Sequence, residues 1–204
     1  TVCYNGLKSL TNRPESAMTF TTLISIALGI GLAASSGFRV FLPLFALSLS
    51  AYFGMWPLNE SWQWLASPAA ITILGVATLA EAVGYLVPYF DHLLDTLAVP
   101  LAGLAGTAVV ASTAADLSPA VTWALAIIAG GGAAAAIKGT AATTRVASTA
   151  ASGGLANPVV STAETGMAVV MTALSLFVPV LAVLLVIGLV VWLARRYTAR
   201  RSTI

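Results

Sequence analysis

Long intervals without a charged residue are the feature that most constrains this chain. Most are close to the roughly twenty residues of apolar helix needed to cross about 30 Å of hydrocarbon. They contain little of the period-two alternation that is typical of membrane barrels. The pattern therefore predicts an all-α, polytopic bundle of about six to seven transmembrane helical segments. The charge-free intervals are 16–38, 40–59, 61–80, 96–115, 117–137, 146–163 and 165–194.

Composition excludes most soluble classes of protein. Of 204 residues, 59% are hydrophobic and 8% are charged, whereas soluble domains carry about 25% charged residues. The single cysteine, Cys3, excludes an intrachain disulfide, and His92 is the only histidine. Zinc sites and serine-hydrolase triads therefore lack most of the side chains they need. We expect no enzyme activity, no catalytic residue, no metal, no cofactor and no nucleic-acid partner.

The same intervals predict the domain organisation. Residues 1–18 are a polar extension that we expect to be disordered, 19–194 form one transmembrane domain, and 195–204 form a basic tail. Basic residues that flank a span favour the cytoplasmic side, so the C-terminus is expected in the cytoplasm. Pro43 favours a short or broken second segment, and Pro179 either separates the last two segments or kinks one long helix. The predicted segments are 19–36, 39–54, 69–88, 97–115, 119–137, 157–176 and 178–194.

Charged residues within or beside these segments are the candidate functional residues, because a charge at the bilayer centre costs roughly 2.5–3.5 kcal/mol. Arg39 lies between Gly37 and Pro43, where a broken helix is expected. It either binds an anion or an acid, or extends to the lipid headgroups. Glu81 lies well inside its segment, with Tyr85 one turn further on. It is either a coupling site for a proton or cation, or one half of a structural ion pair with Arg39.

A pair of aspartates follows in the run PYFDHLLDT. Asp91 and Asp95 are four residues apart, so both carboxylates share one face if the run is helical. Such a pair can hold a divalent cation, relay protons or gate a pathway. The alternative is a solvated helix end, with one aspartate capping the next helix.

The second half of the chain repeats some of these features. The segment GLAASSGFR (31–39) is similar to GGGAAAAIK (130–138), and LASP (65–68) is similar to LANP (155–158). Duplicated halves around a central site are common in secondary transporters, although chance similarity in Ala- and Gly-rich sequence explains the match equally well. Lys138 or Arg145 with Glu164 would then repeat the Arg39–Glu81 pairing. The small residues of 101–108 and 129–136 predict close helix packing.

Three blocks of the sequence resemble a known family. They are GIGLAASSGFRVFLPLFALSL, the E-x-x-x-Y-x-x-P-x-x-D-x-x-x-D run from Glu81 to Asp95, and GGLANPVVSTAE. Together they resemble a bacterial integral-membrane family known as domain of unknown function 4126, over roughly residues 20–190. The resemblance implies a small multi-pass inner-membrane protein, and it supplies no activity, substrate or site.

The residues therefore favour a transporter or channel for an ion or small solute. The expected polar pathway consists of Arg39, Glu81, Tyr85, Asp91, Asp95, Lys138 and Glu164. One alternative is a non-catalytic accessory or assembly subunit of a larger membrane complex. Another is an intramembrane enzyme that uses Asp91, Asp95 and a metal. Expected partners are the lipid bilayer, an ion or small solute, and either further copies of the chain or other membrane subunits.

Overall fold

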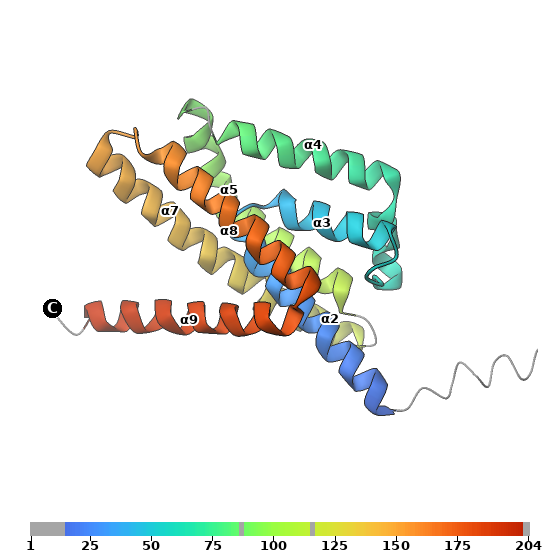
Figure 1. The fold of residues 1–204 in the computed structure, drawn as a ribbon. Coiled ribbons are helices and arrows are strands. Elements are labelled where there is room, and N and C mark those ends of the chain that lie inside the picture. The colour runs from blue at the N-terminus through green and yellow to red at the C-terminus, as the bar shows by residue number, and fades with distance from the viewer. Residues whose placement is uncertain (1–14, 86–87, 115–116, 202–204) are drawn as a thin grey trace, which may run out of the picture.

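The computed structural model describes residues 15–85, 88–114 and 117–201, and within them all regular structure is helical. The predicted all-α bundle is confirmed (Figure 1). Most of the predicted extension 1–18 lies outside the described residues, although the first helix already begins at Glu15. The helices are α2 (Glu15–Ser36), α3 (Phe41–Tyr52), η1 (Glu60–Ala66), α4 (Pro68–Gly84), α5 (Pro88–Thr113), α6 (Pro119–Leu125), η2 (Ala126–Gly131), α7 (Gly132–Ser152), α8 (Asn157–Phe177) and α9 (Pro179–Arg201).

Several helix boundaries follow directly from local sequence. The hydroxyl of Ser67 accepts a hydrogen bond from the Ala70 amide at 3.2 Å, and Pro68 occupies the first turn of α4. In the second half of the chain, Gly153 and Gly154 have φ values of 62° and 91° and end α7 in the left-handed conformation. Helix α8 then begins at Asn157. The similar motifs LASP and LANP thus both lead into a helix.

Two predicted boundaries are wrong because charged residues do not end the helix at either place. The segment predicted as 119–137 continues without a break through α6, η2 and α7 to Ser152. Likewise, α5 begins at Pro88 rather than near 97, so Asp91 and Asp95 lie within it and neither caps a following helix. Val178 leaves the helical region, with φ −139° and ψ 67°, so α8 and α9 are separate helices.

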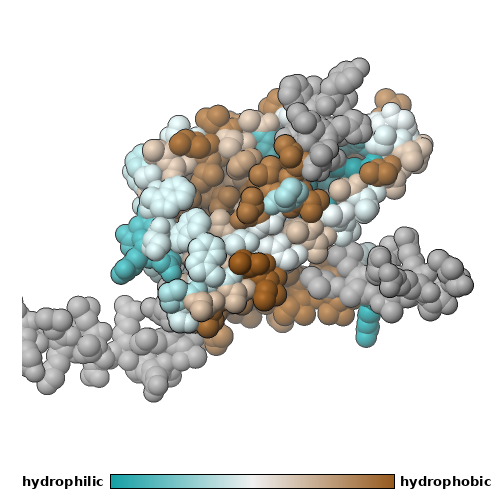
Figure 2. All heavy atoms as spheres, turned by 180° about the vertical axis from the view of Figure 1, so that it is seen from behind, coloured by the Kyte–Doolittle hydropathy of each residue, from teal (hydrophilic) through white to brown (hydrophobic). Residues whose placement is uncertain are grey.

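Two helical stretches, Pro119–Ser152 and Asn157–Phe177, are long and apolar enough to cross a membrane individually. The pair η1 and α4, bent by 67°, adds a third if it forms one span. The other apolar stretches in the described part of the chain are shorter, and they are Phe20–Ser36, Phe41–Tyr52, Leu97–Thr113 and Pro179–Leu189. Large hydrophobic side chains are exposed on many helices, and Figure 2 shows them spread over one face. These apolar helices indicate a membrane protein.

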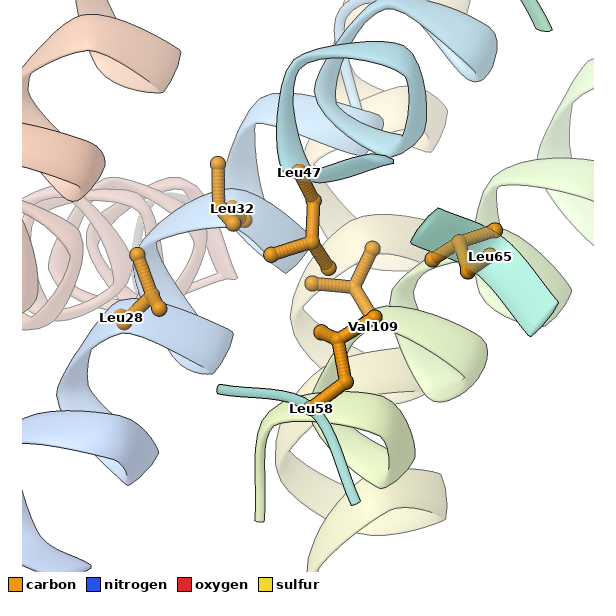
Figure 3. Packing of buried hydrophobic residues seen from close by; sticks show 6 residues of the cluster. All are labelled: Leu28, Leu32, Leu47, Leu58, Leu65 and Val109. Atoms are coloured by element: carbon orange, nitrogen blue, oxygen red, sulfur yellow. The ribbon is translucent and has the colours of Figure 1, made fainter. Parts of the chain in front are cut away.

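Helix α2 lies at the centre of the bundle and contacts α5, α7, α8 and α9. Beside it, α3 packs against α4, which lies at the outside of the bundle (Figure 1). A leucine-rich cluster joins α2 to α3, to α5 and to the segment around η1, and so fixes the position of α3. Figure 3 shows its side chains, which are Leu28, Leu32, Leu47, Leu58, Leu65 and Val109.

The Gly- and Ala-rich segments bring α5 against η2 at backbone distance. A β-carbon on Gly106 would lie 2.5 Å from the Gly130 carbonyl oxygen, and one on Gly130 would lie 2.5 Å from the Gly106 carbonyl oxygen. Only residues without a side chain fit at this crossing. The close packing predicted for 101–108 and 129–136 is therefore confirmed. The π-helical turn of η2 lies at this contact.

Candidate functional site

The site begins at the break between α2 and α3. Helix α2 ends at Ser36, and the chain turns through Gly37 before α3 starts at Phe41. A β-carbon on Gly37 would lie 2.6 Å from Cβ of Ile137 and 2.8 Å from the Ala134 carbonyl oxygen, so α7 approaches too closely for any other residue. The turn directs Arg39 into the bundle, where only 2% of the residue is exposed. The predicted break is confirmed, and Arg39 does not extend to the headgroups.

Glu81 serves as the capping group of α3. Its Oε1 accepts a hydrogen bond from the Val40 amide at 2.8 Å, and its Oε2 accepts one from the Phe41 amide at 3.0 Å. These amides belong to the first turn, where helices lack internal acceptors and where negative charge is favoured. A carboxylate from α4 thus stabilises the broken helix, and 6% of Glu81 is exposed.

Arg39 makes its hydrogen bonds to α8, whereas those of Glu81 go to the amides of α3. Nε of Arg39 donates to Thr165 Oγ1 at 3.0 Å, and its Nη2 donates to the same oxygen at 2.7 Å. Nη2 also donates to the carbonyl and hydroxyl oxygens of Ser161, at 2.9 and 2.7 Å. The third nitrogen, Nη1, is buried and has no hydrogen-bond acceptor. Ser161 and Thr165 lie one turn apart on α8, which is why both reach one guanidinium.

Tyr85 is the centre of the cluster. It ends α4 one turn after Glu81, and 4% of the residue is exposed. Three cationic groups lie near its ring centroid: Arg39 Cζ at 4.4 Å, Lys138 Nζ at 4.8 Å and Arg145 Cζ at 4.2 Å. Each distance is within the range of cation–π attraction, which is stronger in a desolvated site. A neutral aromatic ring therefore helps to hold three positive charges together in the interior.

Helices α7 and α8 complete the cluster with an ion pair. Arg145 donates from Nε to Glu164 Oε1 at 3.0 Å, and its Nη2 binds Oε2. The predicted pairing of Glu164 with a base of α7 is confirmed, and the base is Arg145. Lys138 is fully buried and directs Nζ toward the Phe38 carbonyl oxygen at 3.5 Å. Arg39 and Lys138, which end the two similar segments 31–39 and 130–138, thus lie against the same ring.

A comparison with known protein families finds a match over most of the chain. The family model described as domain of unknown function (DUF4126) matches residues 26–199. The chain belongs to this family. The resemblance inferred from the three sequence blocks is confirmed. The matched part contains all eight described residues of the cluster, which are Arg39, Glu81, Tyr85, Lys138, Arg145, Ser161, Glu164 and Thr165. No curated protein and no solved structure matches the chain.

Two predicted site residues of this DUF4126 member are not placed by the structure. Asp91 and Asp95 belong to α5, but their side chains lie outside the described part, so their role in binding or gating stays a prediction. Where side chains are described, no three His, Cys, Asp or Glu residues come together to hold a metal ion. The structure adds Ser161 and Thr165 to the site. Their spacing with Glu164, on one face of a helix, was the available sequence signal.

Proposed function

We propose that this protein is a transporter or channel for an ion or small solute, and that the cluster around Tyr85 is its solute site. The observation that carries the proposal is the buried Nη1 of Arg39, which has no acceptor although every other nitrogen of that guanidinium is bonded. A buried donor without an acceptor is costly, so such sites commonly receive water or a ligand. The solute would present an anionic or carbonyl oxygen to Nη1.

The broken helix supports the same function. Secondary transporters commonly bind solutes where helices break near the middle of the membrane. Here the break between α2 and α3 lies beside the cluster, and Glu81 positions it by capping α3. Arg39 would contact the solute, whereas Lys138 and the Arg145–Glu164 pair would set the electrostatic environment. Asp91 and Asp95 would be candidates for a gate on the same pathway.

Solute uptake into proteoliposomes tests the proposal. The panel contains chloride, phosphate and acetate, with rubidium as a cation for comparison. We expect uptake of at least one of these probes, and we expect Arg39→Lys to slow it about tenfold or more, since a charge-assisted hydrogen bond is lost. Arg195→Gln, which changes an exposed arginine at the end of the bundle, is the matched control. Equal uptake by Arg39→Lys and the parent protein would remove Arg39 from the pathway.

A second function, an accessory or assembly subunit, is favoured by the internal bonding of the acids. Glu81 and Glu164 both satisfy groups of the bundle itself, as expected of residues that fix a scaffold. Purification in a mild detergent distinguishes the two functions. Recovery in a stoichiometric complex, with no uptake by the isolated chain, would support the subunit function and contradict the transporter.

A further inference from the structure

A cavity lies beside the cluster, between α7, α8 and α9, and Glu164 belongs to both. Its volume is about 260 Å³, and most of its lining is apolar. In Figure 1, α7 lies beside α8 and α9 diverges from α8, and residues of all three helices line the cavity. The lining residues on which the inference depends are Thr140, Thr144, Ala163, Glu164, Met167 and Trp192.

The size and surroundings of the cavity suit an apolar molecule. An engineered apolar cavity of about 150 Å³ stays dry and binds benzene, so a space of about 260 Å³ accommodates a longer hydrocarbon group. Met167 in the lining is 48% exposed, and the neighbouring Val159 on α8 is 72% exposed. In a membrane protein such exposed apolar side chains face acyl chains, so the bilayer is the natural source of the ligand.

The polar groups of the lining specify the other end of the ligand. Thr140 Oγ1 donates its proton to the Ala136 carbonyl at 2.9 Å, and Thr144 Oγ1 donates to the Thr140 carbonyl at 3.0 Å. The Glu164 carboxylate has no proton to donate when it binds Arg145. All three groups therefore offer lone pairs only. Because Arg145 balances the charge of Glu164, a neutral donor fits better than a cation.

We propose that this cavity binds an apolar molecule that ends in a hydroxyl group, such as a long-chain alcohol from the membrane. The hydroxyl lies at Thr140, Thr144 and Glu164, and the hydrocarbon extends along Met167 toward Trp192. This site adjoins the solute site at Tyr85, because Glu164 lines the cavity and also binds Arg145. Ligand binding to the cavity is measured without any transport activity.

Saturable fluorescence quenching in lipid nanodiscs tests this site. The probe is 11-bromoundecanol, and its methyl ether, which cannot donate a hydrogen bond, is the matched ligand. The Trp192 signal is the difference between the parent protein and Trp192→Phe. We expect the alcohol to bind about fivefold or more tightly than the ether, in keeping with one net hydrogen bond.

Two pairs of variants locate the site. Ala163→Leu fills the cavity and should abolish saturable quenching, whereas Ala147→Leu, on the exposed face of α7, should leave it unchanged. Thr144→Val should weaken alcohol binding about fivefold, whereas Thr143→Val should have no effect because Thr143 is exposed and outside the cavity. Equal binding of alcohol and ether, or saturable quenching that persists in Ala163→Leu, overturns the proposal and indicates bulk lipid partitioning only.

Discussion

Replacing Glu164 with Ala is expected to lower the free energy of unfolding by about 3 kcal/mol or more, the range found when one partner of a buried ion pair is removed. Glu164 and Arg145 are both buried, and two N–H groups of Arg145 bind the carboxylate. The substitution leaves a positive charge in the interior without that carboxylate, beside two other cations at the Tyr85 ring. Equilibrium unfolding in mixed detergent micelles measures the change.

Glu60→Gln is the control for the Glu164 experiment. Glu60 is exposed at the start of η1, and surface substitutions usually change stability by less than about 0.5 kcal/mol. Glu164→Gln keeps the volume and one acceptor, so it should fall between the two. If Glu164→Ala is no more destabilising than Glu60→Gln, the ion pair does not hold α7 to α8.

The second large effect is expected at the crossing of α5 and η2. Gly106→Ala adds a methyl group 2.5 Å from the Gly130 carbonyl oxygen and 2.7 Å from the Ala134 methyl, and backbone there cannot move without separating the helices. Overpacking of this kind costs about 1–3 kcal/mol. We expect a clearly lowered unfolding midpoint for Gly106→Ala in the same micelle assay.

Gly139→Ala is the matched control for this crossing. Gly139 is also helical, but a β-carbon there would meet no heavy atom within 4 Å. Because alanine is the better helix former, its unfolding midpoint should stay the same or rise. A similar loss of stability in both variants would mean that the close contact of α5 with η2 does not determine the result.

The sequence predicted the helices well because the apolar intervals have a physical length requirement. Intervals of about twenty residues became helices, and Pro68, Pro119, Pro158 and Pro179 lie in the first turns of four of them. Charges were a poorer guide to helix ends. Lys138 and Arg145 lie inside α7, because contacts from other helices compensate for their burial.

The sequence partly predicted which residues form the site, but it did not predict which groups they bind. A charged residue inside an apolar segment is costly wherever it occurs. The positions of Arg39, Glu81, Lys138 and Glu164 in the sequence were therefore enough to select them. Their partners depend on how helices cross. Glu81 meets the amides of α3 and not a side chain, and no local pattern in its own helix specifies that contact.

The contacts of Tyr85 were also not predictable from the sequence. Its position one turn after Glu81 placed it near the site, but the sequence gives no reason to expect three cations at one ring. That arrangement needs the break after α2 and the whole length of α7, which lie far apart in the chain. Such contacts are properties of the packed bundle.

Access of water to the cluster is the most direct test of the central claim that it is a solute site. The experiment uses a Cys3→Ser background, which removes the native thiol. In it, Thr165→Cys places a thiol next to Arg39, because Thr165 Oγ1 accepts hydrogen bonds from Nε and Nη2 of Arg39. Ala34→Cys places one in the core, where Ala34 is fully buried. The rate of modification by a charged, membrane-impermeant thiosulfonate is measured from each side of the membrane. We predict that the thiol at position 165 reacts from at least one side, much faster than the thiol at position 34. Equal, negligible rates from both sides would show a dry, closed cluster and contradict the account.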